Sequence, residues 1–386
     1  MTAPVYLDNN ATTMVAPEVF EEMRPYFSEL YGNPSSLHSF GGNVAHALDE
    51  ARRKLAALLG AGEEELIFTS CGTESDATAI HSALEEFPDK RHIVTSSVEH
   101  PAVLGLCGHL EKQGYEVTYL GVDEQGRLDL DELAEALRDD TAIVSLMHAN
   151  NESGVVFPLA EIAEIVKARG ILMHTDAVQS VGKLPLDLGE LPVDFLSLSG
   201  HKLHGPKGVG ALFVRRGAPF SSLLIGGHQE DNRRAGTENV ASIVALGKAA
   251  ELAGEHVAEE RERVSAMRDR LQEELVARCP DTLVNGGAAP RLPNTLSISF
   301  GYVEGESIVL LLDELGIYVS TGSACSSDSL EVSHVISRMK VPEMYAHGSI
   351  RFSLSRYNTA TEIDYVSARV PEVIKRLREL SPYGRE

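Results

Sequence analysis

Short apolar segments rich in β-branched residues alternate with helix-like segments from Leu66 to Val214. The intervening stretches, such as Leu130–Leu137 and Leu159–Ala168, place apolar residues at helical spacing. Nearly all-apolar strands that alternate with helices are typical of a mostly parallel sheet covered by helices. We therefore predict an α/β fold. Its strands are expected at Leu66–Thr69, His92–Ser96, Ala142–Met147, Ile171–His174, Phe195–Ser199 and Val209–Val214.

The composition changes after Glu238, where Ala, Glu and Arg become frequent. Apolar residues at helical spacing up to about Cys279 indicate one long helix, or two helices in succession. The rest of the chain has the pattern of a smaller α+β unit. Its expected elements are strands at Thr295–Phe300 and Ser349–Leu354 and helices at Ser307–Leu315 and Ile363–Leu380.

The chain is strongly acidic, because 57 Asp and Glu residues against 34 Lys and Arg residues give a formal net charge of −23. This charge disfavours duplex nucleic acid or an anionic membrane as the main partner, although one local pocket can still bind a small anion. The first ten residues show no signal-peptide pattern. Widely spaced cysteines are typical of a reduced compartment, and we expect a cytoplasmic protein. The cysteines are Cys71, Cys107, Cys279 and Cys325.

Polar residues follow five of the expected strands. Ligands bind beyond the carboxyl ends of parallel strands, so these ends together predict one site. Ser70–Thr73 alone fits a plain helix N-cap better, and it also fits a phosphate site at a helix N-terminus. His100 followed by Pro101 also fits an ordinary helix start. The groups are Ser70–Glu74, Glu99–Pro101, Asn150–Glu152, Asp176 and Gly200–Lys202.

The most specific segment is Gly200–Gly210. It lacks the Gly-Lys-Ser/Thr ending of a Walker P-loop, because Gly208 follows Lys207. What remains is Lys202 at a strand end, in a Gly-rich and nearly apolar setting. Desolvation favours the neutral amine of a lysine, which can form a Schiff base. Lys202 is therefore a candidate for covalent chemistry.

Two further candidates lie in the second half of the chain. The alternation in Ser349–Leu354 turns Arg351 away from the apolar face. Arg351 can pair with a surface acid, or it can present its planar fork to a carboxylate ligand. Cys325 lies in the Ser- and Gly-rich segment Ser320–Ser329, which has no apolar periodicity. An exposed and movable thiol is a better candidate for a nucleophile than for a packing residue.

Motifs spread in order along almost the whole chain resemble one known family. They are Tyr6–Thr13, Gly32–His38, Thr69–Ser75, Val98–Pro101, His174–Gln179, Ser199–Lys202, Arg233–Asn239, Gly322–Cys325 and Ser349–Ser353. Together they resemble the NifS/IscS-type cysteine desulfurases, which are pyridoxal-phosphate enzymes of the class V aminotransferase family. Cys71 and the ending Leu380–Tyr383 look most like the nitrogenase-associated NifS branch. Thr321, Ser326 and Asp328 depart from the usual residues of that branch, which concerns loop mobility or the sulfur acceptor rather than the chemistry.

The resemblance implies the PLP-dependent transferase fold type I, in which a large domain contains a mostly parallel seven-stranded sheet and a smaller domain is α+β. It implies a large PLP-binding domain of residues 14-257. Residues 1-13 plus 258-386 would form the small domain, which carries the mobile cysteine loop 320-329. It also implies a homodimer and a transferase that acts in nitrogen fixation. Because the sulfur goes to iron–sulfur clusters, the resemblance groups the protein with metal-binding proteins, but it assigns no metal ligand in this chain.

The resemblance also implies a role for each site residue. Lys202 would hold the cofactor and move the Cα proton of the substrate, while Asp176 pairs with the ring nitrogen and His100 stacks on the ring. Cys325 would attack the sulfur of L-cysteine, which leaves an enzyme persulfide and L-alanine. The expected catalytic residues are thus Lys202, Cys325 and His100, and an iron–sulfur scaffold protein or another acceptor would take the sulfur.

Binding residues follow from the same resemblance. Arg351 with Asn151 would hold the substrate carboxylate, and Asn151 with Gln179 would bond the phenolic oxygen of the ring. The phosphate would be held by Gly72 and Thr73 at a helix start and by Ser199 and His201 at the end of a later strand. Thr237 of the partner subunit would also reach it. The expected cofactor-binding residues are Gly72, Thr73, His100, Asn151, Asp176, Gln179, Ser199, His201, Lys202 and Thr237 of the partner subunit.

Other functions remain open at this point. An aminotransferase or a selenocysteine lyase would share Lys202 and Asp176, but an aminotransferase would not need Cys325. A metal-dependent hydrolase could use His174, Asp176 and His201 as ligands. A non-enzymatic sulfur carrier or cluster scaffold is the third alternative, and the scattered cysteines disfavour it because cluster ligands are grouped.

Overall fold

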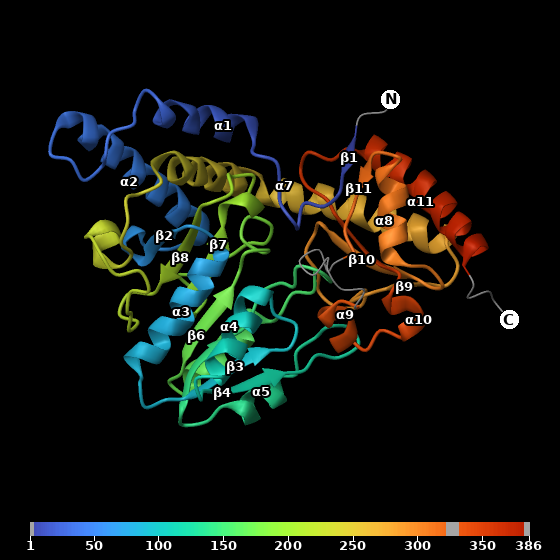
Figure 1. The fold of residues 1–386 in the computed structure, drawn as a ribbon, viewed down its shortest axis with the longest axis horizontal. Coiled ribbons are helices and arrows are strands. Elements are labelled where there is room, and N and C mark those ends of the chain that lie inside the picture. Colours follow the sequence, from blue (N-terminus) through green and yellow to red (C-terminus); the bar gives the residue numbers. More distant parts are fainter. Residues whose placement is uncertain (1–3, 322–331, 382–386) are drawn as a thin grey trace.

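The computed structural model describes residues 4–321 and 332–381, and a seven-stranded sheet forms the centre of its larger part (Figure 1). Neighbouring strands follow the order β2-β8-β7-β6-β5-β3-β4. The pairs are parallel except those of β8, which runs antiparallel to both β2 and β7. The expected mostly parallel seven-stranded α/β sheet is therefore confirmed. Its strands are β2 (Leu66–Thr69), β3 (His92–Ser96), β4 (Glu116–Leu120), β5 (Thr141–Ser145), β6 (Leu172–Asp176), β7 (Phe195–Ser199) and β8 (Gly210–Val214).

The observed strands begin and end within two residues of the expected ones, but the sequence pattern missed β4. β4 is an edge strand that pairs only with β3 in the sheet, and most of its side chains are half-buried or exposed. It therefore lacks the continuous apolar run by which the buried strands were recognised. A second difference is that Asp176, expected just beyond its strand, is the last residue of β6.

Helices cover both faces of this sheet, and alternate strand residues contact opposite faces. Ile67 packs in a core with α3 (Gly72–Glu86) and α4 (Pro101–Glu111). The next residue, Phe68, belongs to the core on the other face. Because neither face meets water, the strands can be apolar throughout. The helices of the second face are α1 (Pro17–Met23), α2 (Ser39–Leu59), α5 (Leu130–Ala136), α6 (Leu159–Ala168) and the first part of α7 (Val240–Arg278).

A separate hydrophobic core lies in the C-terminal part of the chain. It joins a three-stranded antiparallel sheet of order β12-β10-β9 to the second half of α7 and to two further helices. The N-terminal strand β1 pairs in parallel with β11, so the start of the chain also contributes to this core. The division at residues 14-257 stays a prediction. The elements are β1 (Val5–Tyr6), β9 (Thr282–Val284), β10 (Thr295–Phe300), α8 (Gly305–Asp313), β11 (Ile317–Tyr318), α9 (His334–Arg338), α10 (Glu343–Ala346), β12 (Ser349–Ser353) and α11 (Ala360–Leu380).

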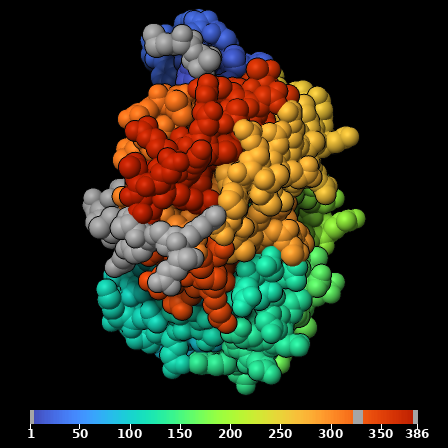
Figure 2. Space-filling view, turned by 90° about the vertical axis from the view of Figure 1, so that its right-hand side faces the viewer, coloured from blue at the N-terminus to red at the C-terminus, as the bar shows by residue number. Residues whose placement is uncertain are grey.

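The segment after Glu238 forms a single helix, α7, which extends from the sheet domain into the C-terminal core (Figure 1). Its C-terminal half packs beside α11, and the two helices lie next to each other on the face shown in Figure 2. Residues of both cores are buried along this one helix. Within the described part of the chain, no helix is both long enough and apolar enough to span a membrane.

Candidate active site

A cavity of about 360 Å³ lies at the carboxyl ends of β3, β5, β6 and β7. Most of the residues that the sequence singled out line its wall together, as the strand-end argument predicted. Thr237 does not line it and is exposed on the segment before α7, while Cys325 lies outside the described residues. The predicted residues in the wall are Gly72, Thr73, His100, Asn151, Asp176, Gln179, Ser199, His201, Lys202 and Arg351.

Lys202 lies in the short turn that directly follows β7. Its Nζ donates hydrogen bonds to the backbone oxygens of Asn10 and of Ala11, the second at 2.8 Å. The side chain is half-buried and borders the cavity. The N-terminal segment, far away in sequence, therefore helps to fix the position of this amine.

Asp176 and His100 lie in the same wall, at the ends of β6 and β3. The Asp176 carboxyl is buried, which raises its pKa, although the 2.9 Å hydrogen bond from the Val178 N–H to Oδ1 opposes this shift. His100 caps α4, because its Nδ1 accepts from the Ala102 N–H at 3.1 Å. Burial lowers the pKa of His100, so the ring is neutral near pH 7 and carries its proton at Nε2.

The N-terminus of α3 forms another part of the wall, with Gly72 and Thr73 in the first turn. Cys71 precedes them in an extended conformation, and its side chain does not cap the helix. The backbone N–H groups of such a helix start attract an anion. Gly72 is needed here because an added Cβ would lie 2.8 Å from Val178 Cγ2. The loop after β6 thus packs directly against the helix start.

His201 also lines the cavity wall, and its ring contacts the N-terminal segment. Its Nδ1 lies 3.1 Å from the Thr12 hydroxyl. Burial, helped by the nearby positive charge of Lys202, lowers the pKa of His201 to about 4, so the ring is neutral near pH 7. Ser199, the buried last residue of β7, also borders the cavity.

Asn10 is a site residue to which the sequence analysis assigned no role. Its backbone oxygen accepts from Gln179 Nε2 at 2.9 Å as well as from Lys202. Its side-chain Nδ2 donates to the Asn151 backbone oxygen at 3.1 Å and to Thr295 Oγ1 at 2.8 Å. Asn10 is almost fully buried and joins the sheet, the N-terminal segment and β10. The sequence pair Asn9-Asn10 gives no signal for this role, because the burial and the distant partners appear only in the fold.

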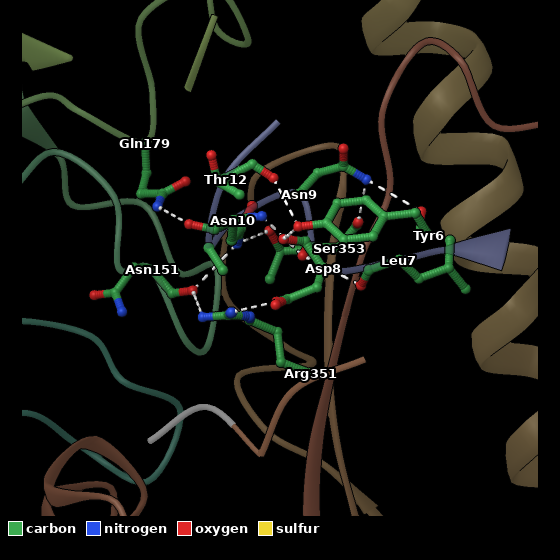
Figure 3. Close-up of polar contacts among 12 residues, drawn as sticks. Tyr6, Leu7, Asp8, Asn9, Asn10, Thr12, Asn151, Gln179, Arg351 and Ser353 are labelled. Carbon is green, nitrogen blue, oxygen red and sulfur yellow. Dashed lines mark hydrogen bonds and ion pairs between the residues drawn. The ribbon is translucent and has the colours of Figure 1, made fainter. Parts of the chain in front are cut away.

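Arg351 extends from β12 to the cavity wall, where it is almost fully buried (Figure 3). Its Nη2 donates to Asp8 Oδ1 at 2.7 Å, and Nη1 donates to the Asn151 backbone oxygen at 3.0 Å. The buried Nε has no hydrogen-bond partner among the described residues. A buried donor without a partner costs free energy, so the protein holds this arginine in place at some cost to its stability.

His174 is not in the cavity, although it belongs to the same motif as Asp176. Its ring lies in the sheet interior, with Nδ1 2.8 Å from Ser145 Oγ and Nε2 2.9 Å from Ser197 Oγ. Burial lowers its pKa to about 3. In the described part of the chain, no group of three or more His, Cys, Asp or Glu side chains is arranged to bind a metal. The three ligands of the hydrolase alternative, His174, Asp176 and His201, therefore do not meet at one metal site.

The cavity fits pyridoxal 5'-phosphate by the chemistry of its walls. The cofactor has an aldehyde that needs an amine, a ring nitrogen that needs an acid, and a phosphate that needs a cradle of N–H groups. Lys202, Asp176 and the N-terminus of α3 provide these three partners in one wall. The contact between Gly72 and Val178 leaves no room for a side chain at this cradle.

Comparison with known proteins assigns the family. The sequence model of "Aminotransferase class-V" matches residues 5–366, and the chain belongs to this family of pyridoxal-phosphate enzymes, in which it groups with the NifS/IscS-type cysteine desulfurases. A solved structure described as "NIFS-LIKE PROTEIN" superposes with a TM-score of 0.91 at 40% identity, covering 97% of this chain and 100% of that chain. Fold type I and the cofactor are thereby confirmed.

Curated relatives narrow the comparison. "Cysteine desulfurase" of Trichormus azollae is 57% identical over 379 residues, which is 98% of this chain and 95% of the relative. "Cysteine desulfurase NifS" of Azotobacter vinelandii is 55% identical over 382 residues, which is 99% of this chain and 95% of the relative. The expected resemblance to the NifS/IscS-type enzymes is therefore confirmed over nearly the whole chain.

Proposed function

We propose that this protein is a cysteine desulfurase that converts L-cysteine to L-alanine and transfers the sulfur to Cys325. One observation carries the proposal: Lys202, Asp176 and Arg351, which are far apart in sequence, line a single cavity. The high identity to relatives named cysteine desulfurase supports cysteine as the substrate. An aminotransferase or a selenocysteine lyase would use the same cavity, so the product has to be measured.

When bound, pyridoxal phosphate supplies an electron-accepting ring that stabilises negative charge at the substrate Cα. The residues of the chain do the remaining work. Lys202 holds the cofactor through Nζ and carries the Cα proton. Asp176 keeps a proton on the ring nitrogen. Burial raises the pKa of this carboxyl, whereas the Val178 N–H and the nearby Lys202 oppose the shift, and a protonated ring nitrogen would further stabilise the carboxylate.

The substrate carboxylate is assigned to Arg351, because its side chain borders the cavity with the planar fork that suits a carboxylate. Nη1 and Nη2 are already bonded to the protein, so the fork is fixed before substrate arrives. A charge-assisted bond from this guanidinium would orient the substrate with its Cα at the ring. Asn151, whose backbone oxygen holds Nη1, would contribute its side chain from the same wall.

The sulfur step is assigned to Cys325, which lies outside the described residues. Its thiolate attacks the sulfur of the substrate, so that a sulfur–sulfur bond forms while the substrate Cβ–S bond breaks. The electron pair of the broken bond stays on carbon, which takes up a proton and becomes the methyl group of alanine. The enzyme is left with a persulfide for an acceptor.

We also propose a cytoplasmic homodimer in which Thr237 of the partner subunit completes the phosphate site. The exposure of Thr237, away from the cavity of its own subunit, supports this arrangement. Delivery of sulfur to an iron–sulfur scaffold in nitrogen fixation is proposed from the similarity to the relative named NifS.

The test is to incubate the cofactor-loaded protein with L-cysteine and a reducing thiol and to measure alanine and sulfide. Equal amounts of both are expected. Cys325→Ala should bind cofactor and cysteine but release no sulfide, whereas Cys279→Ala, at a buried cysteine of the C-terminal core, should retain activity. Sulfide release by Cys325→Ala at the parent rate would overturn the assignment, and transamination without sulfide would indicate an aminotransferase.

A further inference from the structure

Lys183 is a half-buried lysine behind the cavity wall to which the proposed chemistry assigns no role. It lies in the turn after β6, one helical turn beyond Gln179. Its Nζ donates to the Gln179 side-chain oxygen Oε1 at 3.0 Å and to the Gln179 backbone oxygen at 3.0 Å. Both bonds converge on a residue whose own side chain borders the cavity.

The partners of Gln179 decide which end of its amide faces which way. A lysine side chain as ammonium only donates, so it must meet the amide oxygen, and a backbone carbonyl only accepts, so it must meet the amide nitrogen. Gln179 has both, because Lys183 lies at Oε1 and the Asn10 backbone oxygen lies 2.9 Å from Nε2. A flipped amide would place oxygen against oxygen and nitrogen against ammonium.

This orientation determines what the cavity offers a ligand. Nε2 carries two hydrogens, and the Asn10 oxygen takes only one of them. The second hydrogen remains for a group in the cavity that Gln179 borders. A donor at this point suits the phenolic oxygen of the cofactor ring, whereas a flipped amide would present a repelling oxygen.

We propose that Lys183 is a positioning residue, which holds the Gln179 amide so that its nitrogen, and not its oxygen, is presented to the bound cofactor. The inference rests on the proposed cofactor site. Burial and the neighbouring Lys202 and Arg351 lower the pKa of Lys183 to about 7, with Glu260 opposing. The binding titrations are therefore run below pH 7, where Lys183 is mostly the ammonium ion that only donates.

A double-mutant cycle tests this role through cofactor affinity. Purified apoprotein variants are titrated with pyridoxal phosphate, and binding is followed by visible absorbance. Lys183→Met should weaken binding by about tenfold, the effect of one hydrogen bond to a charged group. Lys183→Met placed on Gln179→Met should have almost no further effect, because the amide through which Lys183 acts is gone. Lys183→Arg should restore most of the affinity, since it also only donates.

A second readout is the pH midpoint of the visible absorbance of the bound cofactor. Loss of a donor to the phenolic oxygen should move this midpoint to higher pH in Lys183→Met. The matched control is Lys112→Met at an exposed lysine at the end of α4, which should change neither affinity nor midpoint. Thermal melts of the apoproteins identify any variant that fails to fold. If Lys183→Met fails to fold, the affinities and midpoints of Lys183→Arg and Gln179→Met test the proposal instead.

Three outcomes overturn the inference. The affinity and midpoint of Lys183→Met can equal those of the parent, the loss can be the same with and without Gln179, or Lys183→Arg can be as weak as Lys183→Met. Failure of the parent itself to bind pyridoxal phosphate would instead refute the proposed function, so the two failures are distinguishable.

Discussion

Arg351 and Asp8 form an ion pair in the wall of the cavity, with Nη2 and Oδ1 2.7 Å apart (Figure 3). Arg351 belongs to β12 in the C-terminal core, while Asp8 follows β1 near the start of the chain. Together with the bond to the Asn151 backbone oxygen, this pair fixes two of the three guanidinium nitrogens. The protein thus holds the guanidinium rigidly at the border of the cavity.

The first prediction concerns this fixed fork. Arg351→Lys keeps the charge but loses the planar geometry, so the KM for L-cysteine should rise about 10- to 100-fold, the effect of one charge-assisted bond. Steady-state kinetics with L-cysteine measure the change, and cofactor affinity should stay within about twofold. Asp8→Asn should raise KM less, because an amide oxygen still accepts from Nη2. A variant with unchanged KM but weakened cofactor binding would show that Arg351 holds the cofactor and not the substrate.

The second prediction separates two roles of His100. The ring caps α4 through Nδ1 and is also expected to stack on the cofactor ring. Asn is a good N-cap, so His100→Asn should retain thermal stability, whereas His100→Ala should lose about 1 kcal/mol. Both variants should lose similar shares of kcat, because neither has a ring. If His100→Asn were as active as the parent, the ring would have only the capping role.

The fold could be predicted from the sequence because its signals are local. Short, mostly apolar segments between helix-like stretches mark β5, β6 and β7, and an apolar helical spacing marks α7. That the polar strand ends meet at one site then follows from how parallel sheets are built, whereas the order of the strands came only from the structure. Strand β4 could not be recognised in this way, since half its surface meets solvent and its pattern resembles that of a loop.

The site was predictable where a residue sits at a strand end, as Asp176 and Lys202 do. Asn10 and Lys183 were not predictable, because their importance lies in hydrogen bonds to residues that only the fold brings near. His174 shows the converse. Its spacing from Asp176 suggested that the two side chains share one site. Both residues lie in β6, but only Asp176, at the end of the strand, borders the cavity. The catalytic and binding roles of all these residues, Cys325 and Thr237 included, stay predictions.

The third prediction concerns Glu99, which is fully buried beside His100. Its Oε1 accepts from Ser96 Oγ at 2.7 Å and from the Met147 N–H at 3.0 Å, and burial raises its pKa to about 8. An unfolded glutamate has a pKa of about 4.3, so between these values the folded protein binds more protons than the unfolded chain. The contribution of Glu99 to the stability should therefore fall as pH rises from about 5 to about 8.

Glu99→Gln does not titrate, so its stability relative to the parent should increase across the same pH range. The gain should be on the order of a few kcal/mol at pH 8 compared with pH 5. Urea unfolding of apoprotein at several pH values measures it. The exposed Glu135→Gln is the control and should show almost no pH-dependent difference. A constant difference between Glu99→Gln and the parent would mean that Glu99 is ionised in the folded protein at pH 5.

The fourth prediction compares two helical glycines. At Gly72 an added Cβ would lie 2.8 Å from Val178 Cγ2, whereas at Gly105, exposed in α4, it would meet nothing within 4 Å. Gly72→Ala must therefore push apart the start of α3 and the loop after Asp176, which are two walls of the cavity. Pyridoxal-phosphate affinity should fall about tenfold or more, since a few tenths of an ångström matter to a preorganised anion cradle.

Gly105→Ala should leave that affinity unchanged and stabilise the apoprotein by about 0.5–1 kcal/mol, because alanine favours a helix interior. Titration of both apoproteins with pyridoxal phosphate, and separately with inorganic phosphate as a competitor, measures the cradle directly. Gly72→Ala should weaken both ligands by similar factors if the cradle binds the phosphate group. If Gly72→Ala weakened cofactor binding but left competition by inorganic phosphate unchanged, the phosphate group of the cofactor would bind elsewhere. The displaced wall would then disturb the cofactor ring beside Asp176 and not the phosphate.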